Sequence, residues 1–141
     1  MVAGEDMNRE DKAREFTKEG NQIKDVMLKS LTTQQEFEIV DFRFNLIYDE
    51  VLELSDAIDR ASLDIDEYGF ISNPTLENIL KELADIQYVL SGFAVVFNLP
   101  LDEAYNRVHE SNMSKFPASY REDGKVLKGE NYKEPFLKDL I

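Results

Sequence analysis

The chain has 141 residues, a length typical of one compact domain. Its 29 acidic and 16 basic residues give a net charge of −13, which argues against a nucleic-acid backbone or an anionic membrane as partner. It has no cysteine and a single histidine, which excludes disulfides, thiolate metal sites and multi-histidine metal sites. Any bound metal would therefore be a hard cation held by oxygen.

No targeting signal is recognisable in the sequence. The N-terminal residues are acidic and lack a basic region followed by an apolar run. No stretch approaches the length of apolar residues that a bilayer-spanning helix needs. We therefore expect a cytoplasmic protein.

Two helices are expected in the first half of the chain. A short one covers residues 9–19 and ends at Gly20. A long one covers about residues 33–61, since Thr33 and Glu36 form a capping-box pattern and no glycine or proline follows. Its apolar residues recur at helical spacing: Val40, Phe44, Ile47, Val51, Leu54 and Ile58.

A connection over residues 62–73 precedes the next expected helix. Asn73 reads as its N-cap, Pro74 as its first residue, and the helix should end near Asn98. Its apolar residues also follow a helical repeat: Leu76, Ile79, Leu83, Ile86, Leu90, Phe93 and Phe97.

The remaining chain is expected to hold one more helix and a tail. Asp102 can cap a helix that runs to about Met113, and residues 117–141 read as an irregular tail. The predicted fold class is all-α: an antiparallel bundle of about four helices in a single domain over residues 1–141. The helical core is expected at about 33–116.

Acidic residues occupy matching positions on the two long helices. At 100° per residue, Glu50 and Glu53 lie on one flank of the first apolar stripe, and Glu82 and Asp85 on the same flank of the second. Both pairs lie about 15 Å from the connection if the helices pack antiparallel. Four carboxylates would then converge, and their repulsion would require a cation, for which Mg²⁺ or Mn²⁺ is the natural choice. The alternative is a solvated acidic face.

These blocks resemble the signature of the MazG-like, all-α nucleoside triphosphate pyrophosphohydrolases, a superfamily that includes phosphoribosyl-ATP pyrophosphohydrolases and dimeric dUTPases. The resemblance covers about residues 40–135. It lies in Glu50-x-x-Glu53, Glu82-x-x-Asp85, and the blocks Val108–Lys115 and Asp123–Gly129. The chain differs from many members at Asp49, where they have glutamate.

The resemblance implies a Mg²⁺-dependent reaction, with Mn²⁺ as a substitute. Water attacks the α-phosphorus of a nucleoside triphosphate, which gives the monophosphate and pyrophosphate. The metal ligands would be Glu50, Glu53, Glu82 and Asp85. One of them, such as Glu50, or the neighbouring Asp49 would orient or deprotonate the water, and the sequence leaves that choice open.

Candidate substrate contacts lie near the C-terminus. Lys115, Lys125 and Lys128 suit phosphate binding, with ordinary surface lysines as the alternative. Asn112 could bind a base or ribose, or instead cap a helix. Residues 64–75 begin like a calcium-binding loop, but Tyr68 and Thr75 stand at two of its ligand positions, which favours a polar connection.

Apolar residues on a second helix face suggest assembly. Phe37, Phe42 and Tyr48 lie outside or at the margin of the first stripe, and the relatives pair their helices, so a homo-oligomer (dimer or tetramer) is expected. The N-terminal segment covering Phe42 is the simpler alternative. Two functional alternatives remain: phosphoribosyl-ATP hydrolysis in histidine biosynthesis, and a non-catalytic helical interaction module with a vestigial site.

Overall fold

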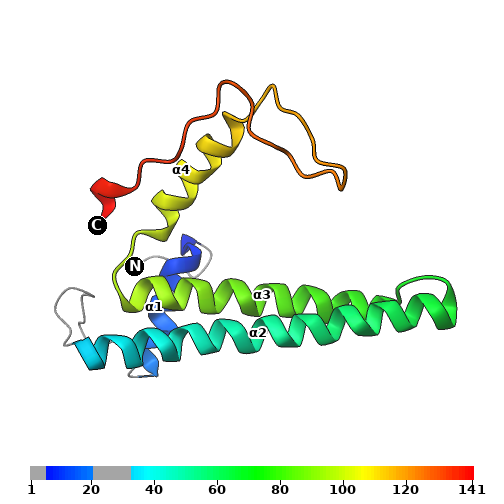
Figure 1. Ribbon diagram of the computed structural model, residues 1–141. Helices are drawn as coiled ribbons and strands as arrows, with labels where there is room; N and C mark the ends of the chain where they lie inside the picture. The colour runs from blue at the N-terminus through cyan, green and yellow to red at the C-terminus, as the bar shows by residue number, and fades with distance from the viewer. Residues whose placement is uncertain (1–5, 21–32) are drawn as a thin grey trace. The chain divides into compact units, whose positions relative to one another are not determined.

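The computed structural model of the chain describes residues 6–20 and 33–141 (Figure 1). In this part the α-helices are α1 (Arg9–Glu19), α2 (Thr33–Tyr68), α3 (Asn73–Val96) and α4 (Leu101–Met113). A short 3₁₀ helix, η3 (Lys138–Leu140), follows, and the described residues contain no strand beyond an isolated bridge between Tyr120 and Val126. The predicted all-α class is confirmed.

The chain divides into two compact units, one ending at Asn98 and the other covering Leu99–Ile141. The first holds α1, α2 and α3, and the second holds α4 and the C-terminal segment. Each unit is described by itself below. That the whole chain forms a single domain stays a prediction.

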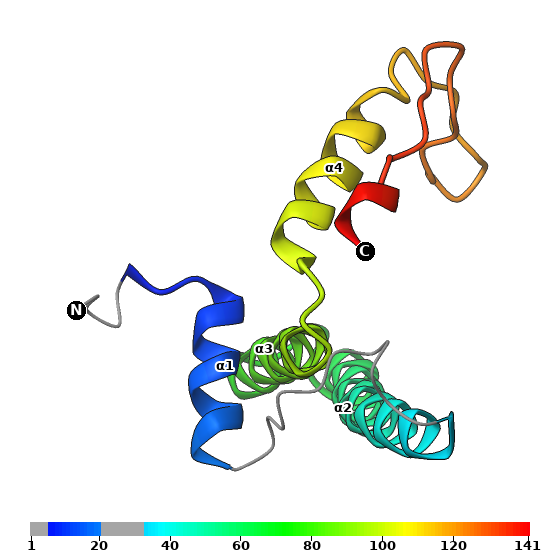
Figure 2. The ribbon, with the colours of Figure 1, turned by 90° about the vertical axis from the view of Figure 1, so that its left-hand side faces the viewer.

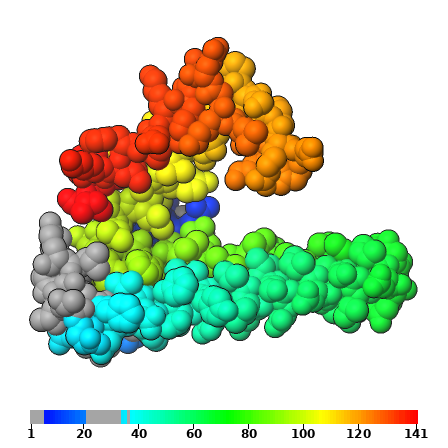
Figure 3. All heavy atoms as spheres, in the orientation of Figure 1, coloured from blue at the N-terminus to red at the C-terminus, as the bar shows by residue number. Residues whose placement is uncertain are grey.

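An antiparallel hairpin of α2 and α3 dominates the first unit (Figures 1 and 2). The space-filling view shows that side chains fill the space between the two helices along the hairpin (Figure 3). Helix α1 crosses α3, and the ring of Phe16 meets that of Tyr88 edge to face, 5.6 Å between centroids. The buried apolar residues are concentrated in the last turns of α3, from Ala94 to Phe97.

Helix α1 has the bounds that the sequence predicts. The Asn8 side chain accepts a hydrogen bond from the Asp11 amide at 2.8 Å, and the Asn8 amide donates to the Asp11 carboxylate at 3.2 Å. This reciprocal capping box fixes the first turn. Gly20 ends the helix, as predicted, with its N–H donating to the Phe16 carbonyl.

Helix α2 extends further than predicted. The expected end near Ala61 is wrong, because the helix continues to Tyr68 and ends at Gly69, whose φ is +77°. The apolar repeat stops near Ala61, but Arg60 binds Asp64 and Glu67 across the next turns. The side chains of Thr33 and Glu36, which form the predicted capping box, lie outside the described residues.

The start of α3 also differs from the expectation. Ser72, and not Asn73, is the N-cap, since its hydroxyl accepts the Thr75 N–H at 3.4 Å. Asp64 at the end of α2 accepts hydrogen bonds from the Ser72 N–H (3.0 Å), the Ser72 hydroxyl (2.7 Å) and the Thr75 hydroxyl (2.5 Å). Because residues 64–68 are helical, they do not form a calcium-binding loop. The helix ends at Val96, close to the predicted Asn98.

In the second unit, the C-terminal segment folds back along α4. The predicted cap at Asp102 is wrong: Pro100 is the N-cap and makes no side-chain cap bond, while the helix ends at Met113 as predicted. The Arg107 guanidinium binds both oxygens of Asp139 and the Phe136 carbonyl. Gly129 packs tightly against the backbone at Pro117. A β-carbon at position 129 would lie only 2.0 Å from the Pro117 carbonyl oxygen, so only glycine fits there.

Within the described residues, no single helix is long and apolar enough to cross a membrane. Only α3 and α4 taken together, as a bent pair, pass that test, and they do so by length and composition alone.

Candidate metal centre

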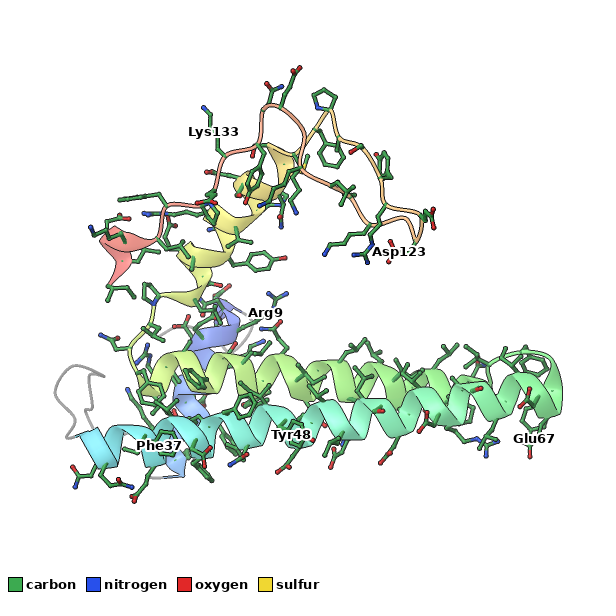
Figure 4. All side chains as sticks on the ribbon, viewed as in Figure 1. Arg9, Phe37, Tyr48, Glu67, Asp123 and Lys133 are labelled. Carbon is green, nitrogen blue, oxygen red and sulfur yellow. The ribbon has the colours of Figure 1, made fainter. Side chains whose placement is uncertain are left out.

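Four carboxylates from the two hairpin helices converge at one point. Glu50, Glu53, Glu82 and Asp85 each offer one oxygen atom, and these atoms all lie within 4.8 Å of one another. The antiparallel register explains this convergence, because residues one turn apart on α2 face residues one turn apart on α3. Tyr48, labelled in Figure 4, marks the level of the cluster on α2, just before Glu50.

Two oxygens of this carboxylate cluster are buried without a partner. Glu82 is only 5% exposed, and its Oε2 atom has no hydrogen-bond donor; the Oε2 atom of Glu50 is in the same condition. Burying a charged oxygen without a donor is costly. A hard cation would satisfy both atoms, so the donor set fits a divalent metal bound by oxygen.

The pKa of Glu50 indicates that the negative charge of the cluster is not fully compensated. Burial raises the pKa of Glu50 above its ordinary value, and the neighbouring Glu53, Asp85 and Glu82 raise that pKa further. All four groups cannot carry their charge at this distance without cost. A bound cation would stabilise the charged carboxylates and so offset both the burial and the repulsion.

A lysine that the sequence analysis overlooked contacts the cluster. The Lys81 Nζ atom lies 2.9 Å from Asp85 Oδ2 and 3.4 Å from Glu82 Oε1. These two contacts raise the pKa of Lys81 above its usual range. The signal was present in the sequence, because Lys81 precedes Asp85 by four residues, a spacing that places both side chains on one helix face.

Asp49, the second candidate for activating water, lies outside the carboxylate cluster. Its side chain is exposed on α2, and it is not a member of the group of converging acids. Asp56, another acid of α2, is exposed as well. Of the two candidates, only Glu50 therefore lies among the other carboxylates.

The four predicted substrate contacts belong to the second unit. Asn112 is exposed on α4, whose C-cap is Ser114, so the capping alternative for Asn112 is wrong. The Lys115 carbonyl accepts the Gly129 N–H at 3.0 Å, and the Lys128 Nζ atom lies 4.6 Å from the centre of the Tyr132 ring. Lys125 is exposed. Their roles in substrate binding stay predictions.

The fold and the carboxylate cluster define a class: an all-α protein whose helical hairpin could hold a metal ion between two acidic pairs. The model of the phosphoribosyl-ATP pyrophosphohydrolase family matches residues 21–112, more than half of the chain. The chain belongs to this family, which is part of the MazG-like all-α nucleoside triphosphate pyrophosphohydrolase superfamily. A search of curated proteins found no match.

The matched region covers all four clustered acids, Lys81, and α4 up to Asn112. Membership indicates a pyrophosphohydrolase, and the family is typically metal-dependent. The three predicted phosphate-binding lysines, Lys115, Lys125 and Lys128, fall after the matched region.

Proposed function

We propose that this protein is a Mg²⁺-dependent nucleoside triphosphate pyrophosphohydrolase, with Mn²⁺ as a possible substitute. It would cleave a nucleotide between the α and β phosphates to give the monophosphate and pyrophosphate. The observation that carries the proposal is the pair of buried, partnerless oxygens on Glu50 and Glu82, in a chain that belongs to a pyrophosphohydrolase family.

Charge explains why such a protein would need the metal. A nucleoside triphosphate has about four negative charges at neutral pH, and four bare carboxylates would repel it. Glu50, Glu53, Glu82 and Asp85 would hold the ion. When bound, it would supply positive charge that offsets the charge of the phosphates and stabilises the leaving pyrophosphate.

Glu50 is our candidate for handling the attacking water. It lies inside the cluster, among the other three acids, while Asp49 is exposed. The water oxygen would bond to the α-phosphorus, the bond from that phosphorus to the bridging oxygen would break, and pyrophosphate would leave with the bonding pair. The water's proton would pass to the Glu50 carboxylate.

Phosphoribosyl-ATP is the second candidate substrate, because the family model carries its name. Its hydrolysis also breaks the bond between the α and β phosphates, so the carboxylate cluster alone does not show which of the two substrates the protein uses. Asn112, Lys115, Lys125 and Lys128 are proposed to contact the nucleotide in either case. The non-catalytic module is the remaining alternative, and it would release no pyrophosphate from any of these compounds.

The test is pyrophosphate release from the eight standard nucleoside triphosphates and from phosphoribosyl-ATP, with and without Mg²⁺. We expect Mg²⁺-dependent turnover of at least one compound, and a loss of about 100-fold or more in Glu82→Gln, which removes a charged ligand. Asp56→Asn, an exposed acid on α2, is the matched control and should keep wild-type activity. Full activity in Glu82→Gln would contradict the ligand assignment.

We also propose that the active form is a homo-oligomer located in the cytoplasm, with a nucleotide substrate and neither nucleic acid nor a membrane as partner. Exposed apolar residues along the hairpin support the assembly. The net charge of −13 supports the exclusion of polyanionic partners.

A further inference from the structure

The α2–α3 hairpin has few basic side chains with which to meet a polyanion. Its described residues include three: Arg43, Arg60 and Lys81. Arg43 is buried against Gly92 near the crossing of α1, and Arg60 is bound to Asp64 and Glu67 at the far tip. Lys81 is the one for which the structure gives ion pairs with two members of the carboxylate cluster.

The atoms that Lys81 contacts are distinct from the buried oxygen. Its ammonium approaches Glu82 Oε1 and Asp85 Oδ2, while Glu82 Oε2 remains buried without a donor. The Lys81 side chain is 62% exposed, so its ammonium lies at the solvent edge of the carboxylate cluster. A long, exposed lysine can move to a new partner without unfolding its helix.

We propose that Lys81 is a phosphate-contact residue that serves as a tethered counter-ion of the cluster until metal and substrate bind. Without a metal, its ammonium offsets the charge of Glu82 and Asp85. Once a divalent ion takes up that charge, the ammonium turns to an oxygen of the triphosphate chain. This inference rests on the proposed function, because it takes the cluster as a metal site that receives a triphosphate.

The first measurement is binding of inorganic triphosphate to the full chain in excess Mg²⁺, by calorimetry. This probe has the charges common to all the candidate substrates and does not depend on hydrolysis. We expect Lys81→Gln to weaken binding by about tenfold, as expected when one charge-assisted hydrogen bond is lost. Lys81→Arg should restore most of it. Lys12→Gln, which removes an exposed lysine on α1, should bind like the wild type.

The second measurement is Mn²⁺ affinity without any phosphate compound. Lys81→Gln should bind Mn²⁺ several-fold more tightly than the wild type, because no ammonium competes for Asp85 and Glu82. Weaker Mn²⁺ binding would show that Lys81 merely positions the two carboxylates, and would overturn the proposal. Unchanged triphosphate binding would overturn it as well.

The two proposals fail in different ways. If no nucleotide is hydrolysed while Lys81→Gln gives both expected shifts, the proposed reaction is wrong and the phosphate contact stands. If nucleotides are hydrolysed but Lys81→Gln changes neither affinity, the reaction stands and the role of Lys81 is wrong.

Discussion

Glu50 is the residue at which burial and charge conflict most directly. It lies among Glu53, Glu82 and Asp85, and one of its oxygens is buried with no donor. Neutralising such a group stabilises a metal-free protein, whereas the charged form is needed to bind a metal. The same side chain therefore should have opposite effects on stability in the two states.

Glu50→Gln tests this conflict. Without metal, we expect its thermal unfolding midpoint to exceed that of the wild type by a few degrees at neutral pH; in saturating Mg²⁺ the order should reverse. Folding raises the pKa of Glu50, so the wild type gains stability as the pH falls from neutral toward the ordinary pKa of a glutamate. The difference between the unfolding midpoints of Glu50→Gln and the wild type without metal should therefore shrink as the pH falls.

The measurement is circular dichroism melting of both proteins with EDTA and with Mg²⁺ over that pH range. Asp56→Asn removes the same charge from an exposed position of α2 and should show no metal-dependent reversal. A lower midpoint for Glu50→Gln in EDTA would contradict the prediction.

At the scale of elements, the tip of the hairpin depends on one carboxylate. Asp64 is 1% exposed, and it joins the last turns of α2 to the N-cap and first turn of α3 through Arg60, Ser72 and Thr75. This network holds the connection between the two helices that bear the clustered acids. It therefore helps to fix the register of α2 against α3, which places Glu50 and Glu53 beside Glu82 and Asp85.

Asp64→Asn should lower the thermal unfolding midpoint at neutral pH. The hydrogen bonds from Thr75 and Ser72 hold the pKa of Asp64 well below its usual range. The charged Asp64 therefore contributes its full stabilisation of the fold at pH values above the usual pKa of an aspartate, and this stabilisation is lost as the pH falls toward the lowered pKa. The difference between wild type and Asp64→Asn should thus be constant down to about pH 4 and narrow below it.

Melting curves across acidic pH give the comparison. Asp66→Asn changes an exposed acid in the same turns of α2 and should cost little. An equal loss in both variants would show that Asp64 has no special role at the tip.

Local sequence patterns predicted the helices better than their ends. The periodic apolar positions located α2 and α3, and the angular offset of the acids anticipated their convergence. The pattern failed at residues 62–73, since Asp64 selects Ser72 as N-cap through contacts from another helix. The pairing of Arg107 with Asp139 spans a long stretch of chain and leaves no local signal.

At the scale of the whole molecule, the apolar stripes predicted for the two long helices are only partly covered. Several of their residues are about half exposed, although the same helices carry the buried acids. They include Phe44, Val51, Ile58, Leu76 and Leu83. An exposed apolar surface of this extent favours association, and a second copy of the chain presents a matching apolar surface.

Ile58→Glu should therefore weaken assembly. Ile58 is 51% exposed in the single chain, so the fold should tolerate glutamate there, while two glutamates facing each other across a symmetric interface would repel. Light scattering coupled to size exclusion should give a multiple of the 16.3 kDa chain mass for the wild type and a smaller mass for the variant. Asn45→Glu adds the same charge about 140° around α2 and should leave the mass unchanged. A monomeric wild type would contradict the proposed assembly, and an unchanged mass in Ile58→Glu would exclude this part of the hairpin from the interface.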